Sequence, residues 1–186
     1  MALSDNIWWT RKARIQTETR LLSNAFQTQL LLLWYSFCSV AASIYYLKFN
    51  TQSDYAGVAW VIFSVLVLCI SGFINGLRFK ESAALIKESY EQLHGLYQKS
   101  KSEPNDPILL TKEYESILNG SENHTDRDYN MALCITWLST KNPDKALDRS
   151  PTKYIWLLFL TYWVRRIILL GGLYLLPFMI FTFMEQ

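Results

Sequence analysis

Two long apolar stretches, residues 28–49 and 56–77, dominate the hydrophobic pattern of the chain. A helix rises about 1.5 Å per residue, so each stretch would be roughly 33 Å long, enough to cross the ~30 Å hydrocarbon core of a bilayer. Lys48 is the only charged residue in the first stretch, and the second stretch has none. Residues 50–55 leave room only for a tight turn. The pattern therefore predicts a transmembrane helical hairpin over residues 28–77.

The segment before the hairpin, residues 1–27, is polar and favours a cytoplasmic amphipathic helix. Ser4 or Asp5 can cap its first turn, and we expect the helix to run unbroken into the first span. Its apolar side chains share one stripe at helical spacing, namely Trp8, Ile15, Leu22 and Phe26. Its basic side chains lie elsewhere on the helix, namely Arg11, Lys12, Arg14 and Arg20.

The distribution of basic residues indicates how the hairpin is oriented. They are plentiful before the first span, and Arg78, Lys80 and Lys87 follow the second span, whereas the turn side has only Lys48. Because basic flanks stay in the cytoplasm, we expect both ends of the hairpin there and residues 50–55 outside. Aromatic side chains typical of a membrane interface bracket the turn, namely Tyr45, Tyr46, Tyr55 and Trp60.

Residues 78–153 are predicted to form a cytoplasmic helical region, into which the second span continues without a helix breaker. The first cytoplasmic helix has a heptad seam at steps of four and three, formed by Phe79, Ala83, Ile86, Tyr90, Leu93 and Tyr97. Such a seam is equally typical of packing against the chain's own helices and of self-association. Two shorter helices follow: one begins at Asp106-Pro107 and ends near Asn119-Gly120, and the other passes through Tyr129 and Trp137.

The last region, residues 154–184, is apolar except for Arg165 and Arg166. A single helix of this length would be about 46 Å long, too long for one straight span. We expect the part before the two arginines to lie in the membrane interface, the arginines to contact lipid headgroups, and residues 167–184 to enter the bilayer. An entirely interfacial helix, or a re-entrant hairpin that turns at Gly171-Gly172, is also compatible with the pattern.

The composition agrees with a small membrane protein. Of the 186 residues, 51% are hydrophobic and 18% are charged, whereas soluble domains have about 25% charged residues. The fold class expected is an all-α membrane protein: a transmembrane hairpin with cytoplasmic helical extensions and a C-terminal membrane-associated segment. The formal net charge of +2 argues against direct binding of nucleic acid, which requires a basic excess.

Signals of enzymatic chemistry are missing from the sequence. His94 and His124 have no second histidine or cysteine pair at metal-ligand spacing, and no phosphate-binding glycine loop is present. Glu122 and Asp126 flank Asn123-His124, but carboxylates placed before a helix more often cap it. The sequence therefore predicts no enzyme, no metal and no cofactor.

Polar side chains inside the second span form the most informative pattern. Ser64, Ser71, Asn75 and Arg78 recur at steps of seven, four and three, which places them on one helical stripe. Such a stripe can line a water-filled path when several copies assemble, or it can bond within the hairpin and hold it together. Gly72 and Gly76 form a Gly-x-x-x-Gly pair that allows another helix to approach closely.

Two stretches resemble a known family. The first is Trp8-Trp9-Thr10-Arg11-Lys12-Ala13-Arg14-Ile15 with Glu18 and Arg20, and the second is Ser121 to Asp126 with Asp128-Tyr129. Together they are similar to the SLATT family of bacterial two-transmembrane effector domains, most closely to its fifth subfamily. The resemblance covers the chain from about Ser4 to at least Lys153.

The resemblance implies an effector of the bacterial inner membrane in antiviral, abortive-infection systems. Such proteins are thought to stay silent until a linked partner reports infection and then to form oligomeric pores. Partners in the family include nucleotide second-messenger synthetases and, for this subfamily, reverse transcriptases. We therefore expect a homo-oligomer that permeabilises or depolarises the membrane when triggered. A membrane-anchored scaffold that recruits a cytoplasmic partner and a holin-like lysis protein are the alternative functions.

Overall fold

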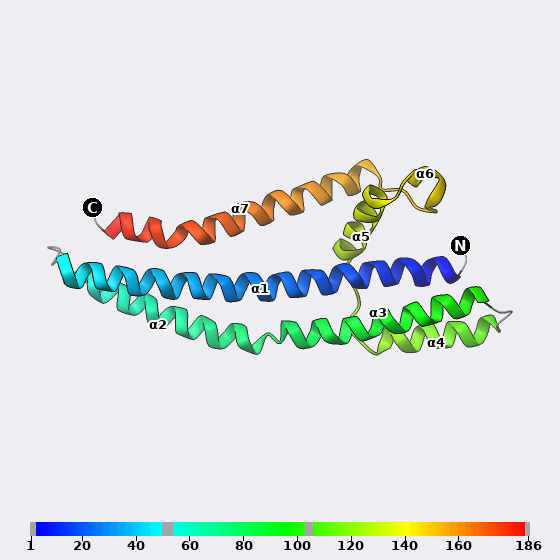
Figure 1. Ribbon diagram of the computed structural model, residues 1–186, viewed down its shortest axis with the longest axis horizontal. Helices are drawn as coiled ribbons and strands as arrows, with labels where there is room; N and C mark the ends of the chain where they lie inside the picture. Colours follow the sequence, from blue (N-terminus) through cyan, green and yellow to red (C-terminus); the bar gives the residue numbers. More distant parts are fainter. Residues whose placement is uncertain (1–2, 50–53, 103–105, 185–186) are drawn as a thin grey trace. The chain divides into compact units, whose positions relative to one another are not determined.

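The computed structural model describes residues 3–49, 54–102 and 106–184, and all regular elements in these ranges are helices (Figure 1). Within them, three helical stretches, beginning at Leu3, Gly57 and Lys153, are long and apolar enough to cross a membrane. The chain is thus an all-α membrane protein, as predicted. In order, the helices are α1 (Leu3–Phe49), α2 (Asp54–Gly76), α3 (Phe79–Ser102), α4 (Pro107–Asn119), α5 (Asp126–Ser139), α6 (Pro143–Ala146) and α7 (Lys153–Met184).

Contacts divide the chain into two units. The polar unit comprises residues 1–23 and 79–163, and the apolar unit comprises residues 24–78 and 164–186. Helices α1 and α7 therefore each contribute one part to the polar unit and the other part to the apolar unit. The predicted turn of the hairpin falls largely on residues 50–53, which lie outside the described residues.

Helix α1 is a single helix of 47 residues, so the predicted continuation into the first apolar stretch is confirmed. Its sequence contains neither glycine nor proline, the two residues that most strongly interrupt a helix. The helix already includes Leu3, so neither Ser4 nor Asp5 caps it, contrary to expectation.

The predicted unbroken passage from the second span into the next helix is wrong. Helix α2 ends at Gly76 and α3 begins at Phe79, and the backbone of Arg78 between them has a φ of 46°. Glycine is a poor helix former, and a left-handed residue cannot continue a right-handed helix. The N–H of Leu77 closes the last turn on the carbonyl of Ile74 at 3.0 Å.

Helix α7 is continuous over 32 residues, and the arginine pair and Gly171-Gly172 lie inside it. A re-entrant hairpin that turns at the glycines is therefore wrong. Pro177 also lies within the helix, and its side chain is among those that are fully buried.

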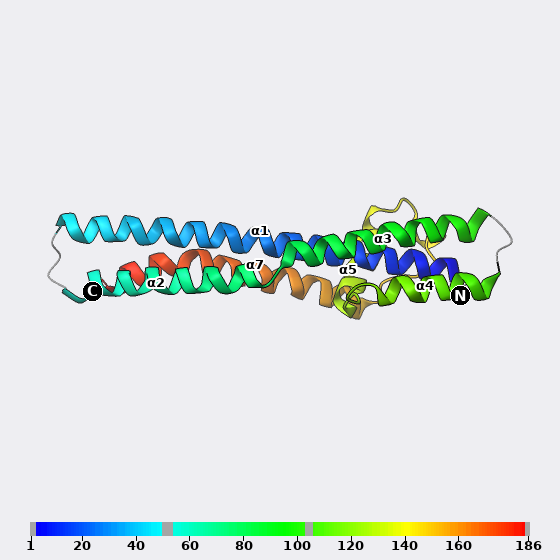
Figure 2. The same ribbon diagram turned by 90° about the horizontal axis from the view of Figure 1, so that it is seen from below.

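The polar unit has a small apolar core to which α1, α3 and α4 contribute. Ile7, Leu93, Leu96 and Leu110 are buried together, and α3 lies beside α4 (Figure 2).

Asp106 accepts a hydrogen bond from the N–H of Ile108 and caps α4, as predicted. Gly120 follows the helix with a φ of −77°, so this end of α4 does not use the left-handed freedom of glycine.

The core of the apolar unit is aromatic. Ala42, Tyr46 and Trp60 are buried together, and Phe63 and Phe181 pack against them. Most other large apolar side chains of this unit are exposed; Leu68 of α2, for example, has 73% of its surface accessible. Such a surface suits hydrocarbon rather than water, since a soluble protein rarely exposes so large an apolar area.

Candidate functional site

The buried face of α1 in the polar unit differs from the predicted one. The side chains that are buried there are Ile7, Trp9, Thr10, Ala13, Arg14 and Thr17. Leu22 and Phe26 of the predicted apolar stripe are 44% and 62% exposed. Polar side chains thus share this buried face with apolar ones such as Ile7, a pattern that hydrophobic periodicity does not reveal.

Asp128 of α5 is the centre of a polar network with α1. Its carboxylate is almost fully buried and accepts two hydrogen bonds from Arg20, from Nε at 2.8 Å and from Nη2 at 2.9 Å. Thr17 donates to the same carboxylate at 3.1 Å. A bidentate guanidinium–carboxylate pair fixes orientation as well as charge, so it sets how α5 lies against α1.

Asp128 also completes the cap of its own helix. Thr125 is the N-cap of α5, and its N–H and hydroxyl donate to Asp128 while its hydroxyl accepts from the N–H of Asp128. This reciprocal arrangement is a capping box. Glu122 and Asp126, the carboxylates predicted to cap this helix, are exposed and do not take that role.

Two titratable groups near the start of α5, Asp128 and His124, have shifted pKa values. Burial raises the pKa of Asp128, but the hydrogen bonds from Arg20 and Thr125 and the charge of Arg20 outweigh it, and the pKa lies below its usual value. Burial and the charge of Arg14 lower the pKa of His124, against the opposing charges of Asp128 and Asp126. The lowered pKa values favour the ionised form of Asp128 and the neutral form of His124.

Arg14 joins α1 to the end of α4. Its side chain is fully buried, and it donates to the carbonyl oxygens of Ile117 at 3.3 Å and Leu118 at 3.2 Å. These carbonyls belong to the last turn of α4, where the helix leaves acceptors without intrahelical partners and carries partial negative charge. Nearby, the hydroxyls of Thr10 and Tyr114 lie 2.7 Å apart.

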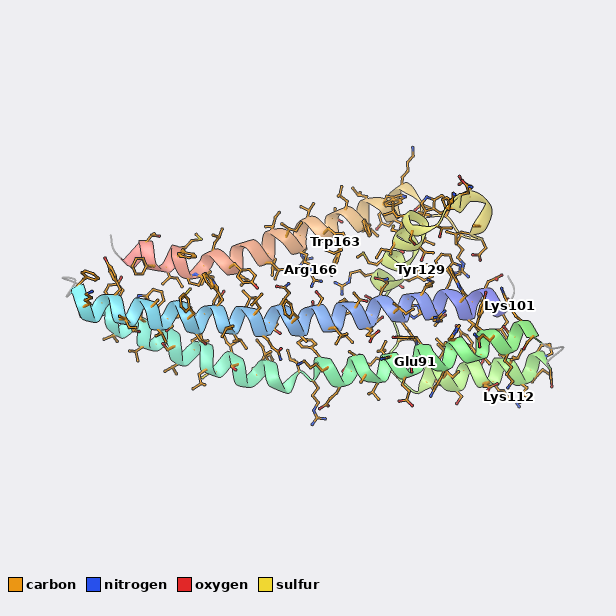
Figure 3. The ribbon with its side chains drawn as sticks, viewed as in Figure 1. Glu91, Lys101, Lys112, Tyr129, Trp163 and Arg166 are labelled. Carbon is orange, nitrogen blue, oxygen red and sulfur yellow. The ribbon has the colours of Figure 1, made fainter. Side chains whose placement is uncertain are left out.

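A second cluster fixes the segment after α6 to α1. Trp9 donates to Asp148 at 2.7 Å, and Arg149 donates to Asn6 at 2.8 Å and to the hydroxyl of Tyr129 at 2.6 Å. The Arg149 guanidinium also lies over the rings of Trp9 and Tyr129, at 5.7 and 5.9 Å. Figure 3 labels Tyr129 on α5. Both stretches behind the family resemblance thus contribute to the contacts of the polar unit.

Sequence reasoning missed this network, although two signals for it are present. Arg14, Thr17 and Arg20 follow each other at steps of three, which places them near one face of a helix. Thr125 and Asp128 have the spacing of a capping box. Neither signal, however, says that the arginines and the aspartate meet.

The predicted polar stripe of the second span is only partly described. Ser64 lies within hydrogen-bond distance of Ser39 in the first span and donates to the carbonyl of Trp60 at 2.9 Å. Ser71 is half-buried, Arg78 is exposed, and the side chain of Asn75 lies outside the described residues. Ser64 therefore bonds within the hairpin, which is one of the two interpretations of the stripe.

Gly72 and Gly76 face open space. A Cβ atom built on either residue would meet no atom within 4 Å, apart from the helix's own backbone. Neither glycine therefore allows a close helix–helix approach within this single chain.

The heptad seam packs inside the polar unit. Ala83, Ile86 and Leu93 are buried, and Tyr97 packs against the apolar core. Phe79 and Tyr90 are half-buried. Intrachain packing therefore accounts for this face of α3.

The two arginines of α7 differ in exposure. Arg165 is exposed and Arg166 is half-buried; Figure 3 labels Arg166 together with Trp163 on the same helix. Arg127 of α5 lies 5.0 Å from the ring centre of Tyr162, one turn before Arg166. The segment around the arginines is thus both basic and aromatic.

Comparison with known families agrees with the resemblance noted from the sequence. The family model described as "SMODS and SLOG-associating 2TM effector domain family 5" matches residues 1–183. The chain belongs to this SLATT family. No curated protein and no solved structure matches it.

Membership in the SLATT family makes the chain a membrane effector domain of the kind associated with defence systems. The match reaches residue 183, so it covers α7 as well as the hairpin. In the described part of the chain, no group of three His, Cys, Asp or Glu side chains could hold a metal ion.

Proposed function

We propose that this SLATT domain is a gated effector of the bacterial inner membrane, which assembles from several copies and depolarises the membrane when a partner binds its polar unit. The observation that carries the proposal is that α1 contributes to both units. A stiff helix transmits a displacement along its axis, so a partner that shifts the contacts of Asp128 and Arg14 can act on the spans.

Several copies are required because a helical hairpin and one further helix cannot enclose an aqueous path. The open face of α2, which carries Gly72 and Gly76, is where the helix of a second copy would approach most closely. Ser71 and Asn75 would line the path, with Arg78 at its cytoplasmic end, whereas Ser64 holds the hairpin together. The basic flanks support an orientation with the N-terminus in the cytoplasm and residues 50–55 outside.

The partner is a linked sensor or enzyme, for which the family resemblance favours a reverse transcriptase or a nucleotide second-messenger synthetase. Arg165 and Arg166 would contact lipid headgroups at the cytoplasmic surface, since basic and aromatic side chains together suit that boundary.

The experiment is to follow a membrane-potential dye in cells that express the complete system, with and without phage. We expect depolarisation only after infection. The double variant Ser71→Leu and Asn75→Leu should abolish it while membrane insertion is retained, because leucine removes the polar lining. Ser36→Leu is the matched control, since Ser36 bonds to the carbonyl of Leu32 on its own helix and lies off the stripe.

Unchanged depolarisation by the double variant would reject the stripe as a pore lining. Protection from phage without any depolarisation would favour the membrane-anchored scaffold. Depolarisation without infection or partner would favour a holin-like protein. The dye signal, read together with protection from phage, therefore separates the three functions.

A further inference from the structure

Helix α7 contains a proline at a position where the helix loses a backbone hydrogen bond. Pro177 has no N–H, and its ring displaces the carbonyl of the residue four positions earlier, which is Leu173. In water such a carbonyl binds solvent. In hydrocarbon, a carbonyl without a hydrogen-bond donor costs several kcal/mol, so another group must donate to it.

Helix α1 provides these donors. The Tyr35 hydroxyl donates to the carbonyl oxygen of Leu173 at 2.8 Å. The indole N–H of Trp34 donates to the next carbonyl, that of Tyr174, at 3.0 Å. Two consecutive side chains of one helix thus satisfy two consecutive carbonyls beside the proline.

Further contacts set the direction of α7 within the apolar unit. The Tyr174 hydroxyl donates to Gln27 at 3.2 Å. Phe181 packs against Tyr45 and Tyr46 near the end of the first span, with ring centres 5.3 and 6.0 Å apart. Residue numbers therefore rise together on both helices, so this part of α7 runs parallel to α1 (Figures 1 and 2).

We propose that the part of α7 from Ile167 to Met184 is a third membrane span, locked to α1 by two hydrogen bonds: Tyr35 donates to the Leu173 carbonyl that Pro177 exposes, and Trp34 donates to the adjacent carbonyl of Tyr174. At about 1.5 Å per residue this part rises about 27 Å, close to the ~30 Å of the hydrocarbon core. Because the span runs parallel to α1, its end lies on the same side of the membrane as the hairpin turn. This inference does not depend on pore formation.

The topology is tested in intact cells with a membrane-impermeant maleimide, on a chain whose native cysteines are replaced by alanine. One variant carries Gln186→Cys, just beyond α7, and the matched control carries Asn119→Cys at the exposed end of α4. We expect Gln186→Cys to be labelled in intact cells and Asn119→Cys to be labelled only after the cells are permeabilised. Labelling of both from the same side would overturn the third span.

The lock is tested by a double-mutant cycle on the full chain in detergent. Tyr35→Phe keeps the ring but removes the donor, and should lower the unfolding midpoint by about 2–4 °C. Pro177→Ala restores an N–H that can bond to Leu173, so in that background Tyr35→Phe should change the midpoint far less. Equal losses in both backgrounds would overturn the lock, even if the topology result stands.

Discussion

The two units hold the same helix α1 by different physical means. In the polar unit, α1 is fixed by charge: Arg20 binds the Asp128 carboxylate, and Arg14 binds the last carbonyls of α4. In the apolar unit, α1 is fixed by aromatic packing and by neutral hydrogen bonds, such as the one from Tyr35 to Leu173. Charged pairs are sensitive to pH, whereas the aromatic contacts are not.

This difference between the contacts of the two units indicates where regulation can act. A partner or a change of protonation can alter a buried ion pair by several kcal/mol, because removal of one charge leaves the other unpaired. A lipid-exposed helix pair has few such groups to alter. We therefore expect a trigger to act on the polar unit and the response to occur in the apolar unit.

The largest effect is expected from Asp128→Ala. It leaves Arg20 without its carboxylate and removes half of the capping box of α5, so the polar unit should lose about 3–5 kcal/mol of unfolding free energy. Glu113→Ala is the matched control, because its pair with Lys99 is 44% exposed on both sides and should contribute below about 1 kcal/mol. Denaturant unfolding measures both, and similar losses would contradict the role of the network.

A smaller effect is expected from acidification. The pKa of His124 is lowered in the folded chain, so the unfolded chain binds its proton more readily, and stability should fall as the pH drops below about 6.5. His124→Asn should flatten this part of the profile. Asp128 acts at lower pH: its pKa is lowered, so its contribution is present above the unfolded value near 3.8 and is lost as the pH falls through the folded one. A profile that His124→Asn leaves unchanged would argue against a buried neutral imidazole.

The smallest effect is expected in the apolar unit from Ser39→Ala. Ser39 is buried and lies within hydrogen-bond distance of Ser64 across the hairpin. Hydrogen bonds between membrane helices contribute about 0.6 kcal/mol on average, because the separated helices find other partners. The unfolding midpoint in detergent should therefore fall only slightly. A loss as large as that of Asp128→Ala would remove the contrast between the units.

The sequence predicts the helical elements well where one strong signal dominates. A long stretch without charged residues, 56–77, predicts most of α2, and the pair Asp106-Pro107 predicts where α4 begins. The buried face of α1 could not be predicted, because Thr10 and Arg14 on it are polar. Their partners lie more than 90 residues away in the chain, Tyr114 for Thr10 and Ile117 for Arg14, and local periodicity carries no information about such contacts.

The end of α2 and the course of α7 show the same limit. A single glycine before Arg78 is a weak stop signal, because glycine is also tolerated inside helices, as at Gly171-Gly172. Pro177 favours a break by itself, yet the helix continues, and Tyr35 donates to the Leu173 carbonyl that the proline leaves without a helical partner. In the same way, the candidate site in the polar unit is visible in the sequence only as separate motifs, because no local signal says that these motifs meet.

The most direct test of coupling between the units is a break in α1 at their boundary. Phe26 lies just after the polar unit's part of α1 and is 62% exposed, so Phe26→Pro interrupts the helix without removing a buried side chain. Phe26→Ala is the control. With both variants inserted in the membrane at equal level, we predict that phage infection depolarises cells with Phe26→Ala and leaves cells with Phe26→Pro polarised. Equal depolarisation in both would contradict transmission through α1.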